Sequence, residues 1–127
     1  MKYSKQWEIQ GFRVAPPYQR ILKVLLSPDL HRTKNLSVGM TLLPPGSKSS
    51  LHIHNEEEEI WFVTSGRGRA IVGEDEIPIE KDVAIYIPPK ERHQLVNTGD
   101  ETLKVLWIFS PPGPERDFIE KRMARPS

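Results

Sequence analysis

Residues 46–66 of the chain read GSKSSLHIHNEEEEIWFVTSG and carry its most informative pattern. His52 and His54 are two positions apart, so on a β-strand their imidazoles project from the same face. Two buried imidazoles repel each other when both are protonated, and a shared divalent cation removes that cost. Taken alone, the pair is better interpreted as two solvent-facing histidines on an edge strand.

The acidic run that follows favours the metal interpretation. Glu59 begins a strongly apolar run and shares a face with Trp61, whereas Glu58 has the opposite parity. If the face of Glu59 is interior, its carboxylate needs a cation or hydrogen-bond donors. The two glutamates before Glu58 are interpreted as a solvated loop.

A third histidine, His93, opens another apolar run after a Pro88-Pro89 pair. Three imidazoles and one carboxylate make a nitrogen and oxygen site that suits Mn, Fe, Co, Ni, Cu or Zn in higher coordination. Four protein ligands around an octahedral ion leave positions for water and substrate. We therefore predict one divalent transition metal, bound by His52, His54, Glu59 and His93.

The rest of the chain predicts an all-β fold with a short helix at its C-terminal end. Runs rich in Val, Ile, Leu and aromatic residues recur between Gly, Pro, Asn and Asp, at the spacing of a sandwich or barrel. Residues 27–35 are expected to form a loop and 115–123 a helix. The expected strands are 19–26, 36–43, 50–54, 59–64, 67–72, 77–79, 83–87, 93–96 and 102–109, with an edge strand within 7–14.

Composition restricts the classes of function. A chain of 127 residues fits one domain, expected here as 1–127 with a core barrel at about 18–110 and a C-terminal tail or short helix at 111–127. It has no cysteine, so disulfides and thiolate metal sites are excluded. A net charge of +1 favours neither nucleic acid nor a membrane surface as partner. Without a signal sequence or a membrane-length apolar run, a cytoplasmic protein is expected.

These motifs resemble those of the cupin superfamily. Its first motif, Gly-x5-His-x-His-x(3,4)-Glu-x6-Gly, is met in full by Gly46, His52, His54, Glu59 and Gly66. The resemblance implies a double-stranded antiparallel barrel of the jelly-roll kind, with the metal inside one end.

The second cupin motif, Gly-x5-Pro-x-Gly-x2-His-x3-Asn, is met at three of its five positions by Pro88, His93 and Asn97. Asp82 and Lys90 stand where the motif has its two glycines. Because those glycines serve turns, the departures concern the shape of the loops and not the metal ligands.

Strand alternation predicts an apolar substrate pocket beside the metal, lined by Met40, Trp61, Trp107 and Phe109. Glu58 and Tyr86 are the only candidates for a general acid or base. The sequence shows no Ser-His-Asp set, phosphate-binding glycine loop or nucleotide fingerprint.

Two classes of function remain open. The first is a metal-dependent enzyme, such as a dioxygenase, a lyase or decarboxylase, or an isomerase, that acts on a small oxygenated substrate. The second is a non-catalytic module that binds or senses a small molecule. Apolar residues expected on outer strand faces, Ile60, Phe62 and Ile108, predict a homodimer, as small cupins commonly form.

Overall fold

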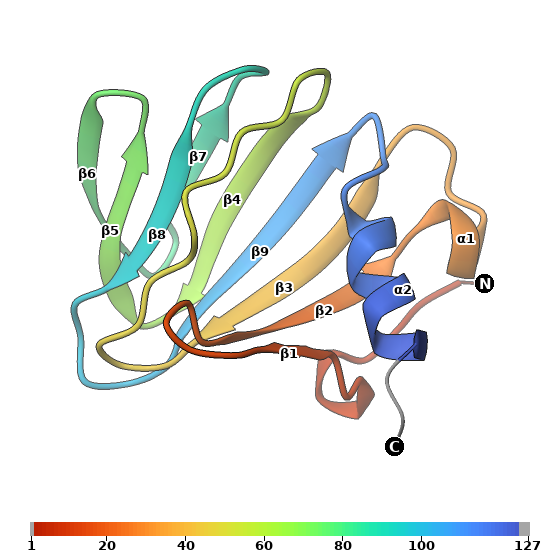
Figure 1. Ribbon diagram of the computed structural model, residues 1–127, viewed down its shortest axis with the longest axis horizontal. Coiled ribbons are helices and arrows are strands. Elements are labelled where there is room, and N and C mark those ends of the chain that lie inside the picture. The colour runs from red at the N-terminus through yellow and green to blue at the C-terminus, as the bar shows by residue number, and fades with distance from the viewer. Residues whose placement is uncertain (1, 125–127) are drawn as a thin grey trace.

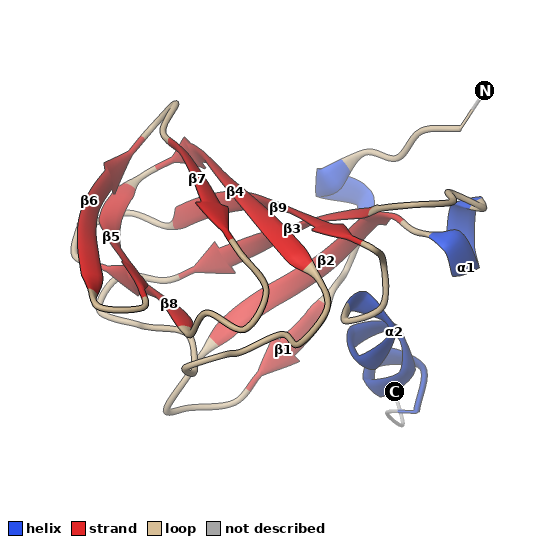
Figure 2. Ribbon diagram, turned by 90° about the horizontal axis from the view of Figure 1, so that it is seen from above, coloured by secondary structure: helices blue, strands red, loops and turns tan. Residues whose placement is uncertain are grey.

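The computed structural model describes residues 2–124 and consists almost entirely of antiparallel strands (Figure 1). One sheet has six strands in the order β1-β2-β3-β9-β4-β7, and the second has three in the order β6-β5-β8. Seen from above, the two sheets curve around a common interior (Figure 2). The strands are β1 Phe12–Val14, β2 Arg20–Leu26, β3 Ser37–Leu43, β4 Glu58–Ser65, β5 Arg67–Val72, β6 Asp75–Glu80, β7 Ala84–Ile87, β8 His93–Asn97 and β9 Leu103–Ser110.

Alternation along the central strands builds the core. In β9, Leu103, Val105, Trp107 and Phe109 are all at most 3% exposed, while the residues between them are half-buried. Antiparallel pairing with β4 sets Trp61 opposite Trp107. Each such large apolar side chain contributes about 1.5–3 kcal/mol by leaving water, so this strand pair fixes which face of the sheet is interior.

Two short helices complete the described part of the chain, together with a 3₁₀ turn at Gln6–Glu8. Helix α1 (Pro28–His31) forms because Ser27 accepts a hydrogen bond from the Leu30 amide at 3.2 Å, which caps its N-terminus. Helix α2 (Glu115–Ala124) packs beside β1 and β2 at one end of the barrel (Figures 1 and 2). Among the described residues, no helix is long and apolar enough to cross a membrane.

The all-β barrel and the C-terminal helix predicted from the sequence are confirmed, and three local expectations are corrected. Residues 50–54 form no strand but an extended segment, joined to β8 by the isolated bridge between His52 and His93. The edge strand expected within 7–14 is limited to β1, and the loop expected at 27–35 contains α1.

The two motif positions that lack glycine keep a glycine-like backbone. Asp82 has φ 74° and Lys90 has φ 68°, both in the left-handed region that ordinary residues rarely adopt. The Lys90 amide donates to the His54 carbonyl at 2.6 Å, which ties this turn to the segment that carries the histidines. The turns of the second motif are therefore preserved in spite of the substitutions.

Candidate metal centre

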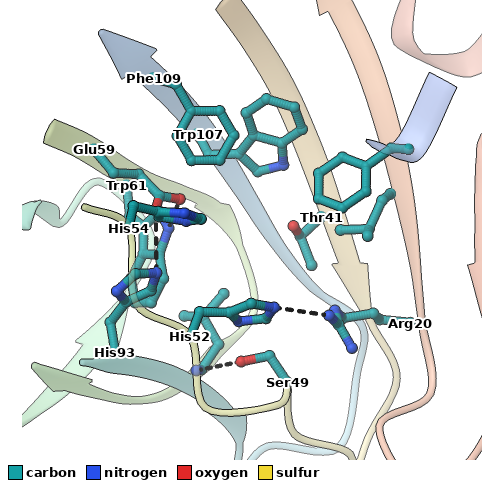
Figure 3. Close-up of a pocket in the computed structure, with 13 residues that line it drawn as sticks. Arg20, Thr41, Ser49, His52, His54, Glu59, Trp61, His93, Trp107 and Phe109 are labelled. Atoms are coloured by element: carbon teal, nitrogen blue, oxygen red, sulfur yellow. Dashed lines mark hydrogen bonds and ion pairs between the residues drawn. The ribbon is translucent and has the colours of Figure 1, made fainter. Parts of the chain in front are cut away.

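A cavity inside the barrel collects the predicted ligands from three separate segments (Figure 3). His52 and His54 come from the extended segment before β4, Glu59 from the start of β4, and His93 from the start of β8. The cavity has a volume of about 50 Å³. The residues that line it are Arg20, Leu22, Thr41, Ser49, His52, His54, Glu59, Trp61, His93, Leu95, Trp107, Phe109 and Phe118.

Three of the four predicted ligands converge tightly. Nε2 of His93 lies 3.3 Å and Nε2 of His54 lies 3.5 Å from Oε1 of Glu59. One ligand atom from each of the three residues lies within 4.8 Å of the others. Glu59 and His93 are buried, and the His54 side chain is 19% exposed.

The hydrogen bonds around these residues leave acceptors facing one another. Nδ1 of His93 lies 3.0 Å from the Glu91 carbonyl, which can only accept, so this nitrogen carries the proton. In the neutral ring Nε2 is then an acceptor, and it faces the acceptor Oε1 of Glu59. Within residues 2–124, Glu59 Oε1 is buried with no hydrogen-bond donor. A cation between these atoms satisfies both, and a histidine held through its other nitrogen is typical of metal ligands.

The other oxygen of Glu59 holds the carboxylate in place. Its Oε2 accepts a hydrogen bond of 2.6 Å from the Trp61 indole, two residues along the same face of β4. This bond leaves Oε1 directed toward the two imidazoles, as Figure 3 shows. The residues present therefore fit a divalent metal, with two imidazole nitrogens and one carboxylate oxygen as ligand atoms.

The ionisation of the site follows from burial and mutual contact. Burial alone would raise the pKa of Glu59, but contacts with His54, His93 and Trp61 outweigh it and hold that pKa below its usual value. Burial alone would lower the pKa of His93, but the Glu59 carboxylate reverses this and raises it. The carboxylate is therefore ionised at neutral pH, as ligation requires.

His52 lies beside this cluster, not within it. Its ring centroid is 5.9 Å from that of His93 and 6.3 Å from that of His54. Its Nε2 is 3.1 Å from Ser50 Oγ and 3.5 Å from Nη2 of Arg20. Burial, and then the positive charge of Arg20, lower the pKa of His52 to about 4, so the ring is neutral at physiological pH.

Three of the four predicted pocket residues line the cavity, and the fourth does not. Trp61, Trp107 and Phe109 line the cavity, and the aromatic rings of the last two lie 4.9 Å apart. The expectation for Met40 is wrong, because its neighbour Thr41 faces the cavity and adjacent strand residues point to opposite faces. Met40 is buried on the other side of β3.

Glu58 and Tyr86, the two expected acid or base candidates, are corrected as well. Both are exposed on the outer face of the sheet, where Ile60 of β4 pairs with Tyr86 of β7. A hydrogen bond to Glu58 raises the pKa of Tyr86. Alternation explains the placement, because Glu59 points inward and its neighbour Glu58 must point outward.

Sequence reasoning missed the residues that close the cavity on the side away from Glu59. Arg20 and Thr41 come from β2 and β3, Ser49 from the loop after β3, and Phe118 from α2. The one available signal was Arg20, which alternates with Leu22 and Val24 on what is plainly a buried face. A charged residue in such a pattern is unusual enough to mark a site.

Comparison with known proteins agrees with this geometry. A family model described as a cupin domain matches residues 39–109. An uncharacterised protein of Methanocaldococcus jannaschii, MJ1618, is 35% identical over 97 residues, which is 76% of this chain and 78% of that protein. Auxin-binding protein 1 of Arabidopsis thaliana is 35% identical over 99 residues, but these are 71% of this chain and only 49% of that protein.

Solved structures show the same fold. The crystal structure of a protein described as a predicted oxalate decarboxylase from Thermotoga maritima superposes with a TM-score of 0.77 at 26% identity, covering 86% of this chain and 98% of that one. The KdgF protein of a Halomonas species superposes with a TM-score of 0.75 at 17% identity, covering 91% and 98%. With the family model spanning more than half of its length, this chain belongs to the cupin family.

Proposed function

We propose that the chain is a metal-dependent enzyme that acts on a small oxygenated substrate. The observation that carries the proposal is the pair of facing acceptors, His93 Nε2 and Glu59 Oε1, which lie 3.3 Å apart in a buried cavity. Two acceptors held this close need a positive charge between them, and a divalent ion supplies it without protonation of His93. His54 completes a set of two imidazoles and one carboxylate, which is found in catalytic zinc sites and in non-haem iron oxygenases.

The proposed cofactor is one divalent transition metal: Mn, Fe, Co, Ni, Cu or Zn. His54, Glu59 and His93 would hold it, with His52 as a fourth ligand. Such an ion supplies Lewis-acid polarisation of a substrate oxygen or activation of water, or redox chemistry with dioxygen if it is iron. The reaction classes to be distinguished are therefore dioxygenase, lyase or decarboxylase, and isomerase.

The lining and the volume of the cavity limit the size of the substrate. Trp61, Trp107 and Phe109 line the cavity and make much of its wall apolar. The cavity volume of about 50 Å³ is small. This space favours a substrate of few atoms. The resemblance to a structure described as a predicted oxalate decarboxylase supports the lyase or decarboxylase class.

A non-catalytic small-molecule binding protein is the second candidate. It is favoured by the outward placement of Glu58 and Tyr86, because Glu59 is then the only carboxylate that lines the cavity in the described part of the chain. The resemblance to auxin-binding protein 1 supports the same class. The homodimer and the cytoplasmic location expected from the sequence stay predictions.

Metal titration followed by an activity screen tests the proposal. Metal-free protein is loaded separately with each of the six ions, and bound metal per chain is measured after removal of the free ion. The double variant His54→Ala, His93→Ala is expected to lose metal binding, while the matched control His31→Ala, on helix α1, keeps it. Metal bound equally by the double variant and the wild type would contradict the ligand assignment.

The screen then separates the two functions. Loaded protein is incubated with small hydroxy acids, oxo acids and diketones while oxygen uptake and carbon dioxide release are recorded. Oxygen uptake that requires iron selects the dioxygenase, and carbon dioxide release without oxygen selects the decarboxylase. Binding of such compounds without turnover supports the non-catalytic alternative.

A further inference from the structure

Arg20 is a buried cation in the same cavity, next to His52. It is 6% exposed and lines the cavity together with Thr41 and Ser49 (Figure 3). Within residues 2–124, no Asp or Glu forms an ion pair with it. Buried arginines are almost always paired with an anion, because removing the charge from water is costly.

The hydrogen bonds of Arg20 leave most of its donors free. Nη1 donates to the Tyr18 carbonyl at 2.8 Å, and Nη2 lies 3.5 Å from Nε2 of His52. A guanidinium carries five N–H groups, and the described contacts account for at most two of them. Burial lowers the pKa of Arg20, yet an arginine keeps its charge at neutral pH. The cavity therefore contains a charged guanidinium whose remaining N–H groups need hydrogen-bond acceptors.

A second hydrogen-bond donor in the cavity also lacks an acceptor. The indole N–H of Trp107 is buried without an acceptor among the described residues, and this residue also lines the cavity. Thr41, on the strand next to β9, adds a hydroxyl to the wall on this side (Figure 3). The side of the cavity away from Glu59 is thus rich in donors, whereas the cluster side is rich in acceptors.

We propose that Arg20 binds the carboxylate of a small acid, whose second oxygen group points toward the His54, Glu59 and His93 cluster. The inference rests on the proposed function and names its substrate class: small hydroxy or oxo carboxylic acids. A planar guanidinium matches the two oxygens of a carboxylate. His52 links Arg20 to the cluster, because its Nε2 lies 3.5 Å from the guanidinium and its ring centroid 5.9 Å from that of His93.

Binding of glycolate and glycolamide to metal-loaded protein tests this inference. The two compounds have the same size and the same hydroxyl group, but only glycolate carries a carboxylate. Dissociation constants are measured by calorimetry for the wild type, Arg20→Gln and Arg20→Lys, and metal affinity is measured separately for each. The matched control is Arg69→Gln, which removes an equal charge from an exposed arginine that pairs with Glu76 at 2.6 Å.

The wild type and Arg69→Gln are expected to prefer glycolate. Arg20→Gln should weaken glycolate binding about ten- to a hundredfold, as expected for hydrogen bonds to a charged group, with glycolamide binding unchanged and metal binding no weaker than in the wild type. Arg20→Lys keeps the charge but loses the planar guanidinium. Its affinity for glycolate should lie between those of the wild type and Arg20→Gln. Circular dichroism verifies that each variant is folded.

Three results would overturn the assignment. The wild type could bind both compounds equally, it could bind neither, or Arg20→Gln could keep the full preference for glycolate. The last result would mean that the metal alone holds the carboxylate. Failure of the proposed function is seen separately, because the wild type would then take up no metal at all.

Discussion

Replacing Glu59 with glutamine separates a metal-binding role from a structural one. Glutamine has nearly the same volume, and its amide oxygen can still accept the 2.6 Å hydrogen bond from the Trp61 indole. The substitution removes a negative charge from a side chain that is 4% exposed. The stability of the metal-free protein should therefore change by no more than about 1 kcal/mol, the scale of one neutral hydrogen bond.

The metal-loaded protein should respond very differently. One unit of charge even ~4 Å from a cation is worth about 4 kcal/mol per cation charge at an effective dielectric constant of about 20. A hundredfold loss of metal affinity is thus a conservative expectation. At a metal concentration of about 100 times the wild-type dissociation constant, stabilisation of the wild type is about 2.7 kcal/mol, and that of the variant falls to about 0.4 kcal/mol.

Thermal unfolding with and without metal measures the difference. For a chain of this size, about 3–5 °C per kcal/mol gives an upward Tm shift of about 8–13 °C for the wild type and about 1–2 °C for Glu59→Gln. Glu58→Gln is the matched control, because Glu58 is adjacent, has the same chemistry and is exposed on the outer face. An equal metal-induced shift in Glu59→Gln and the wild type, or its loss in Glu58→Gln, would refute the reasoning.

Three further substitutions test the fold around the site, each by urea denaturation followed through tryptophan fluorescence. Lys90→Gly should stabilise the protein by about 0.5–1 kcal/mol, because φ is 68° there and left-handed backbone is unfavourable for lysine; a lower urea midpoint would contradict this. Gly39→Ala should destabilise it by about 1–3 kcal/mol, because a Cβ at this position overlaps the indole ring of Trp107; an unchanged midpoint would show that the ring is free to move. Glu115→Ala should cost about 2–4 kcal/mol, because buried Glu115 accepts a 2.6 Å hydrogen bond from Ser37 that joins α2 to β3; a loss below 0.5 kcal/mol, the scale of an ordinary surface substitution, would show that this bond does not hold the helix.

The inward direction of the candidate ligand side chains could be predicted from the sequence, because alternation along each segment decides it locally. Glu59 was distinguished from Glu58 by parity with Trp61, and the structure adds the physical reason: the Trp61 indole holds one carboxylate oxygen. His52 and His54 were expected to share a face because of a strand that does not form. Both still line the cavity, because the extended backbone between them alternates as a strand does, even with a single bridge to β8.

The far wall of the cavity could not be predicted, because it depends on how the barrel closes. Arg20 and Phe118 lie almost a hundred positions apart in sequence and line one cavity. Only the docking of α2 beside β2 places them together. No local pattern encodes that docking, although one buried hydrogen bond, from Ser37 to Glu115, accounts for part of it.

The error at Met40 has the most informative cause. Strand parity assigns the more apolar face of β3 to the interior, which would turn Val38, Met40 and Leu42 inward. The structure turns the small and polar face inward instead, because Trp107 of β9 occupies the space above Gly39. Val38, Met40 and Leu42 are thereby left on the outer face of the six-stranded sheet, whereas Leu43 lies in the core.

Neighbouring strands extend that outer face with Ile60, which is 41% exposed, and with the half-buried Phe62 and Ile108. An antiparallel sheet that packs its core on one side ordinarily presents polar residues on the other. Apolar side chains on both faces are instead expected where a second layer covers the sheet. The exposure of these three residues of β4 and β9 agrees with the homodimer predicted from the sequence, and a mass near 14.6 kDa by light scattering, that of a single chain, would contradict that prediction.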